Sequence, residues 1–128
     1  MLIGLRFGSN DLEKSRAFYD ATFGTLGVAP SNVPAEYAIL LYNLPGGGRF
    51  MCGPARDGAP ATPANGGTAV LEAPSKDVVS AWHAAGLANG GVSEGEPEPK
   101  PQANGAFGAY LRDPDGNKLG IYHGLDLG

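Results

Sequence analysis

The two halves of this 128-residue chain repeat one pattern of elements, and this repeat constrains the fold most strongly. Ala17-Phe18-Tyr19 aligns with Ala81-Trp82-His83 at an offset of 64 residues, and Gly27-Val28 aligns with Gly91-Val92 at the same offset. Each half begins with alternating apolar residues, which predict a strand, and continues with apolar residues at helical spacing. A unit of this size cannot bury a sheet face alone, so the repeat predicts two units that fold against each other.

Hydrophobic periods and capping residues locate the elements. Residues 2–7 predict a strand, and Asn10 or Asp11 can cap a helix that runs to about residue 23. Residues 68–73 and Ser75 predict the matching strand and cap. Residues 28–34 and 92–105 are rich in Pro and Gly and predict at most short, irregular strands, with an extended polyproline-like loop over 94–105. Hairpins are expected at 36–53 and 106–123.

The second hairpin contains the clearest turn of the chain, Asp113-Pro114-Asp115-Gly116-Asn117. Pro114 fixes φ at the first turning position, the Asp113 carboxylate can accept from turn amides, and Gly116 can take a positive φ. Pro45-Gly46-Gly47-Gly48 stands at the corresponding turn of the first half. The sequence therefore predicts an α+β fold: one domain over 1–128, made of two tandem βαβββ modules (1–64 and 65–128). Their strands form a curved mixed sheet with a concave cleft and with the helices on its outer face.

Charge and cysteine content restrict partners and location. The formal net charge of −4 and a pI near 5.0 argue against nucleic acid and anionic membranes as partners. No apolar run approaches the length of a membrane span, and the first residues show no signal-peptide pattern. The single cysteine, Cys52, cannot form an internal disulfide, and its strand parity predicts burial under the helices. We therefore expect a cytoplasmic protein.

The closing hairpin at 110–122 resembles that of the vicinal-oxygen-chelate superfamily, which includes glyoxalase I, extradiol dioxygenases, and bleomycin and fosfomycin resistance proteins. The resemblance extends over nearly the whole chain, from the first strand and the helix start at 10–19 to the last hairpin. It implies the paired βαβββ fold and a binding cleft. It does not fix a function, because this scaffold hosts isomerases, dioxygenases, antibiotic-modifying enzymes and plain binding proteins.

The resemblance also locates the positions where metal-using relatives have their ligands. Carried over by motif, these positions are occupied here by Gly4, Met51, Thr68 and Gly120. None of these residues offers a good donor to a hard or borderline divalent ion. The two histidines are expected to lie elsewhere, His83 on the outer face of its helix and His123 at a strand end. The resemblance therefore implies no metal cofactor. A divalent Zn, Ni, Fe or Mn ion is expected only under the alternative that the protein is a metal-dependent enzyme.

Strand parity predicts which side chains line the cleft, because alternate residues of a strand point to the same face. The candidate ligand-binding residues on the cleft face are Arg6, Arg49, Met51, Thr68, Val70, Glu72, Lys118 and Tyr122. Two roles are open for Arg6, namely an ion pair with Glu72 or an anchor for a carboxylate or other oxyanion. Arg49 and Lys118 follow turns, so they are either solvated or form a cationic rim. Glu72 and Tyr122 are the candidates for a catalytic proton carrier.

Three functions are compatible with these residues. The first is a metal-free protein that binds a small anionic or polar aromatic molecule, as bleomycin-resistance relatives bind a drug without a catalytic metal. The second is a divalent-metal-dependent lyase, isomerase or dioxygenase of the glyoxalase type, which needs a metal and a carboxylate base. The third is a metal-independent enzyme that uses Arg6 with Glu72 or Tyr122. The sequence leaves open whether the protein is an enzyme.

The segment 37–42 is strongly apolar for one side of a small domain. Members of the resembled superfamily are commonly dimers. We therefore expect a homodimer whose partners are a second copy and a small-molecule ligand, with no nucleic acid and no membrane.

Overall fold

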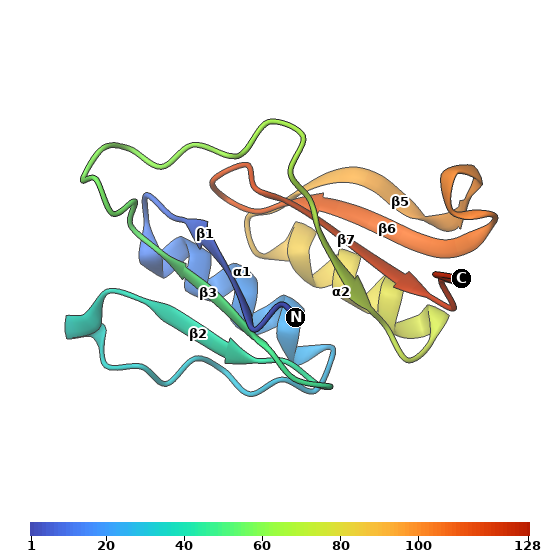
Figure 1. The fold of residues 1–128 in the computed structure, drawn as a ribbon, viewed down its shortest axis with the longest axis horizontal. Coiled ribbons are helices and arrows are strands. Elements are labelled where there is room, and N and C mark those ends of the chain that lie inside the picture. The colour runs from blue at the N-terminus through green and yellow to red at the C-terminus, as the bar shows by residue number, and fades with distance from the viewer.

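The computed structural model describes residues 1–128 and contains two helices and seven strands (Figure 1). The elements of the first half are β1 (Gly4–Gly8), α1 (Leu12–Gly24), β2 (Leu40–Asn43) and β3 (Arg49–Gly53). Those of the second half are β4 (Ala69–Glu72), α2 (Lys76–Ala88), β5 (Val92–Lys100), β6 (Ala106–Arg112) and β7 (Lys118–His123). Short 3-10 turns lie at Ala35–Tyr37 and Pro101–Ala103. No helix is both long and apolar enough to cross a membrane.

The strands form two mixed sheets, in the orders β1-β3-β2 and β4-β7-β6-β5. In each sheet the first strand of the half runs parallel to the last, and the hairpin strands run antiparallel. Figure 1 looks onto the sheets with both helices behind them. The predicted α+β architecture with helices on one face is confirmed. The sheets are not joined: β1 and β4 each have an edge with no strand partner, and these edges bound a seam between the halves.

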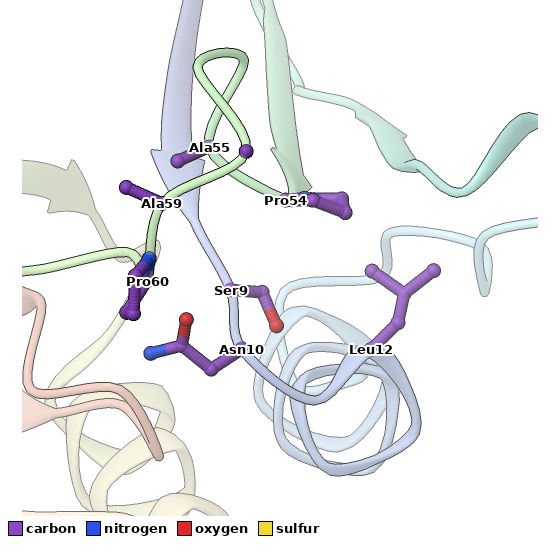
Figure 2. Close-up of a pocket in the computed structure, with 8 residues that line it drawn as sticks. Ser9, Asn10, Leu12, Pro54, Ala55, Ala59 and Pro60 are labelled. Atoms are coloured by element: carbon purple, nitrogen blue, oxygen red, sulfur yellow. The ribbon is translucent and has the colours of Figure 1, made fainter.

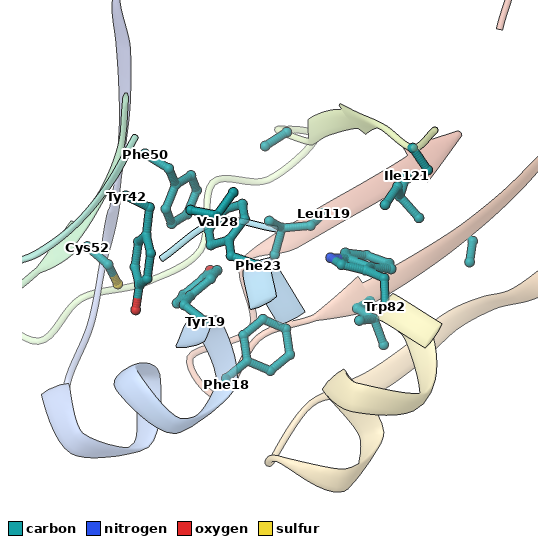
Figure 3. Close-up of a cluster of buried hydrophobic side chains, with 14 of the residues drawn as sticks. Phe18, Tyr19, Phe23, Val28, Tyr42, Phe50, Cys52, Trp82, Leu119 and Ile121 are labelled. Atoms are coloured by element: carbon teal, nitrogen blue, oxygen red, sulfur yellow. The ribbon is translucent and has the colours of Figure 1, made fainter. Parts of the chain in front are cut away.

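Helix starts and strand parity also follow the prediction. Asp11 accepts from Lys14 N at 3.2 Å and Ser75 accepts from Val78 N at 3.2 Å, so both helices are capped as expected. Figure 3 shows the core between helices and sheets, where the ring centroids of Tyr19, Phe23 and Phe50 lie within 6 Å of one another. Buried strand residues of the predicted parity face this core: Phe50, Cys52, Leu119 and Ile121. Burial raises the pKa of the Cys52 thiol to about 12, so it is an unreactive apolar side chain.

The two Pro- and Gly-rich segments differ from expectation in opposite directions. Residues 28–34 form no strand, so the first half has one strand fewer than the second. Residues 92–105, predicted to form at most a short, irregular strand with an extended loop over 94–105, instead contain the nine-residue strand β5. Pro97 and Pro99 are tolerated there because β5 is an outer strand with a partner on one side only, and its pairing with β6 shifts register between Ser93 and Glu98.

Strand β2 occupies the outer edge of the smaller sheet and contains residues 40–42 of the apolar segment at 37–42. Leu40 and Tyr42 are buried in the core, whereas Tyr37 is 67% exposed. Part of the apolar segment that motivated a homodimer is thus buried within the chain. The dimer stays a prediction.

The prediction that His83 lies on the outer face of its helix is wrong. The side chain is buried, and its Nε2 lies 2.8 Å from Ser93 Oγ on β5. The reason is that β5 extends along the sheet edge and covers the side of α2 that the sequence left open. Glu96 Oε2 lies 4.0 Å from His83 Nδ1, too far for a hydrogen bond.

The buried histidine predicts a loss of stability in mild acid. Burial lowers the pKa of His83 below its ordinary value, with Glu96 raising it and Lys100 lowering it further. Neutral His83 is therefore favoured in the native state, while the unfolded chain takes up a proton below about pH 6.5. We expect the free energy of unfolding in urea to fall between about pH 7 and pH 5, more steeply than for His83→Gln. Identical slopes for the two proteins would contradict this role.

Candidate functional site

A cavity of about 280 Å³ occupies the seam between the two halves. It lies between β1 with the turn that precedes β3 on one side and β4 on the other. Four of its lining residues were singled out from the sequence: Gly4, Arg49, Thr68 and Val70. Arg49 is its only charged residue, and the other lining residues are mostly aliphatic or glycine. This cavity offers one cation above an apolar wall.

A second cavity, of about 330 Å³, lies further along β4 beside β7 and the C-terminal residues. Its lining comprises Val70, Leu71, Glu72, Tyr122, Leu125 and Leu127. Glu72 is the only charged residue, and it pairs in register with Tyr122 across the parallel strands. Leu125 and Leu127 were not anticipated, because nothing in the sequence indicates that the residues after β7 fold back beside it.

A smaller hollow of about 180 Å³ adjoins both cavities. It shares Val70 and Leu71 with each of them, Gly47 with the seam cavity and Glu72 with the second cavity. The three hollows together follow the unpaired edge of β4, and we name them the β4 groove. Val70 lies at its centre and is 53% exposed.

Arg6 does not pair with Glu72, so that expectation is corrected. Its Nη2 donates to the Pro54 carbonyl oxygen at 2.7 Å, on the loop that follows β3. The sequence could not indicate this contact, because it depends on the path of an irregular loop. Arg6 lines none of the three hollows of the β4 groove, so Arg6, Glu72 and Tyr122 do not form one constellation.

Tyr122 belongs to a reciprocal pair of tyrosines on the face of the larger sheet away from α2. Its hydroxyl lies 2.6 Å from that of Tyr110, and the rings meet edge to face at 5.8 Å. Each ring lies over a glycine directly opposite in the β6–β7 register, Tyr110 over Gly120 and Tyr122 over Gly108. The register of the predicted hairpin was the signal that could have identified Tyr110.

The hydroxyl group of Tyr122 is neutral. Burial, then hydrogen bonding to Tyr110, raises the pKa of Tyr122 well above its ordinary value. Tyr122 is therefore a hydrogen-bond donor at neutral pH and unsuited to be a general base. Lys118 Nζ lies 5.1 Å from the centroid of the Tyr110 ring, where the cation faces the ring's π-electrons.

The metal-ligand positions do not fit a divalent ion. A Cβ at Gly4 would lie 3.2 Å from Met51 Cε, and a Cβ at Gly120 would lie 2.6 Å from Tyr110 Cε1. Both glycines are thus covered by neighbouring side chains, and Thr68 offers only a hydroxyl. No group of three His, Cys, Asp or Glu side chains anywhere in the chain is arranged to hold an ion.

The largest hollow, about 480 Å³, lies at the start of α1 against the loop after β3 (Figure 2). Its polar side chains already have partners within the protein. Ser9 Oγ lies 2.6 Å from Ser15 Oγ, and Asn10 exchanges hydrogen bonds of 2.9 and 2.7 Å with the Ala61 backbone. The β4 groove, where charged side chains have no such partners, is the better candidate.

Comparison with known proteins gives one consistent family. The model of the glyoxalase/bleomycin resistance protein/dioxygenase superfamily matches residues 5–121. A glyoxalase/bleomycin resistance protein from Albidiferax ferrireducens T118 is 42% identical, with a TM-score of 0.87 over 96% of this chain and 98% of that chain. No curated protein sequence matches.

Two further structures show the same fold at lower identity. A glyoxalase-related enzyme from Fulvimarina pelagi has 22% identity and a TM-score of 0.77, covering 96% of this chain and 87% of that chain. Lactoylglutathione lyase from Agrobacterium tumefaciens has 21% identity and a TM-score of 0.68, covering 100% of this chain and 96% of that chain. At these identities the likeness concerns the fold alone.

Proposed function

Because the chain belongs to the glyoxalase/bleomycin resistance protein/dioxygenase superfamily, we propose that it binds a small anionic or polar aromatic molecule in the β4 groove without a metal ion. The observation that supports this most directly is the covering of Gly4 by Met51 and of Gly120 by Tyr110. The Tyr110 ring occupies the space into which a ligand side chain at position 120 would project, and the flexible Met51 side chain lies against position 4. The same region offers an apolar wall, hydroxyl donors and one exposed arginine, which suit a polar organic molecule.

The alternatives need arrangements of a different kind. A glyoxalase-type metal enzyme needs about three protein ligands around an ion, and the four candidate positions supply none of the usual donors. A metal-independent enzyme built on Arg6 needs that guanidinium beside the proton carrier, whereas Arg6 binds the Pro54 carbonyl. Binding alone demands neither feature.

Titration calorimetry against a mixed panel tests the proposal. The panel contains aromatic carboxylates, neutral hydroxyaromatic compounds and cationic glycopeptides of the bleomycin class. We expect saturable binding of a carboxylate or hydroxyaromatic compound. Val70→Asp should weaken it at least tenfold, because a carboxylate would replace the apolar centre of the groove.

Val92→Asp is the matched control, because Val92 is 63% exposed on the outer strand β5 and lines none of the three hollows. It should retain the affinity of the unmodified protein. A preference for the cationic glycopeptides would reverse the proposed ligand charge. Equal effects of the two substitutions would show that the ligand binds outside the groove.

A further inference from the structure

We infer that the ligand of the β4 groove is dipolar: it has an anionic group at one end, an apolar body, and an ammonium or other hydrogen-bond donor at the opposite end. This inference rests on the proposed function and specifies the ligand class. It comes from the distribution of charge along one strand. The seam cavity and the second cavity of the groove each have one charged lining residue. These are Arg49 and Glu72, which have opposite charges.

The three hollows of the β4 groove adjoin one another along an apolar stretch of the chain. Val70 and Leu71 line all three of them. Leu44 also lines the seam cavity and the hollow that joins it to the second cavity. Desolvating such a wall favours an apolar ligand body by about 25 cal/mol per Å² buried.

The charged residues at the two ends of the groove have no partner within the protein. Arg49 and Glu72 are both exposed and make no side-chain hydrogen bond or ion pair. Most other charged groups near the two sheets do have partners. Lys100 binds Glu98, Arg112 binds Glu94, and Arg6 binds Pro54. Arg49 and Glu72 are thus unpaired charges that border the apolar wall.

A hydroxyl group lines the same cavity as each of the two charges. Thr68 lines the seam cavity with Arg49, so a hydroxyl accompanies the cation there. Tyr122 lies in register with Glu72, so a phenol hydroxyl accompanies the carboxylate. A carboxylate or phosphate group suits the Arg49 end, and an ammonium or hydroxyl donor suits the Glu72 end. Thr68 and Glu72 are four residues apart along an extended chain, about 13 Å.

The test uses the full chain and unbranched ω-aminocarboxylic acids with increasing numbers of methylene groups as probes in titration calorimetry. The fatty acid and the alkylamine of equal chain length are the single-charge controls. We expect affinity to rise to an optimum at a length of about 13 Å, the span from Thr68 to Glu72 along the chain. At that length, each single-charge control should bind roughly three- to fivefold more weakly, as expected for the loss of an exposed ion pair.

Variants assign the two ends. Arg49→Gln should remove the advantage of the amino acid over the alkylamine, and Glu72→Gln its advantage over the fatty acid. Arg56→Gln and Glu36→Gln are matched controls, because both residues are exposed, unpaired and absent from the three hollows, and they should leave all affinities unchanged. The double reversal Arg49→Glu with Glu72→Lys should restore the preference for the dipolar probe with its orientation reversed.

The outcomes separate this inference from the proposed function. Equal binding of all three probe types, with weakening by Val70→Asp but by neither charge variant, would overturn the dipolar ligand and leave the groove as the binding site. Absence of binding by these probes and by the mixed panel would overturn both. A length optimum that disappears in Arg49→Gln and in Glu72→Gln supports the inference.

Discussion

Asp113→Ala should destabilise the protein by about 3–5 kcal/mol, the largest effect that we expect from one side chain. Asp113 is only 2% exposed, and its carboxylate accepts hydrogen bonds from the Tyr19 hydroxyl, from the backbone N–H groups of Asp115 and Asn117, and from the Asn117 side chain. Alanine would leave these donors without partners, most of them in the protein interior. Urea unfolding monitored by circular dichroism measures the change.

The same network joins the two halves of the chain, which explains why the effect should be global. Asn117 Nδ2 donates to the Gly8 carbonyl of β1 at 3.0 Å, and Asp115 Oδ1 accepts from Asn10 N at 2.9 Å. Asp57→Ala is the matched control, because Asp57 also accepts from a turn amide, Ala59 N, but in an exposed loop. We expect less than about 1 kcal/mol there. Similar losses for the two variants would show that burial of the Asp113 network is unimportant.

Gly120→Glu should destabilise the protein by about 2–4 kcal/mol and should not create a metal site. A Cβ at this position would lie 2.6 Å from Tyr110 Cε1 and 2.9 Å from Tyr110 Cδ1. The new side chain must displace the ring and break its hydroxyl contact with Tyr122. Urea unfolding gives the stability change, and calorimetric titration with Zn²⁺ gives the metal affinity.

Two further variants isolate the steric cause. In a Tyr110→Ala background the added cost of Gly120→Glu should fall below about 1 kcal/mol, a coupling that a double-mutant cycle measures. Gly24→Glu is the control for the substitution itself, because a Cβ at Gly24 meets no atom within 4 Å. Unaltered stability of Gly120→Glu, or tight Zn²⁺ binding by it, would show that Tyr110 does not block the position.

Much of the fold was predictable because short-range chemistry determines it. The alternation of Phe50 and Cys52 with their neighbours located the core face, since strand side chains point alternately to opposite sides. The caps Asp11 and Ser75 located the helix starts, since a side-chain oxygen there satisfies a free backbone N–H. The turn at 113–117 located the last hairpin.

The parts that could not be predicted depend on long-range packing. Strand β5 forms only because an outer position tolerates Pro97 and Pro99, and its presence buries His83. The contact of Arg6 with Pro54 depends on the course of the loop that follows β3. Strand parity placed Arg49, Val70 and Glu72 on one side, but the division of that side into adjoining hollows depends on the seam between the two sheets.

Gly120 shows both what could be predicted from the sequence and what could not. The resemblance to the superfamily implied that a metal ligand is missing there, which is an expectation about one residue. It did not indicate that the Tyr110 ring fills the space, which requires the β6–β7 register and the ring orientation. In the structure, position 120 therefore lacks a donor side chain and is also blocked by the Tyr110 ring.

The central claim is that this protein binds its ligand without a metal ion, and elemental analysis combined with calorimetry tests it most directly. The untagged chain is purified without chelator, its Zn, Ni, Fe and Mn contents are measured, and the best ligand of the mixed panel is titrated before and after dialysis against a chelator. The account predicts far less than one metal ion per chain and the same affinity in both titrations. A stoichiometric metal ion whose removal abolishes binding would contradict it.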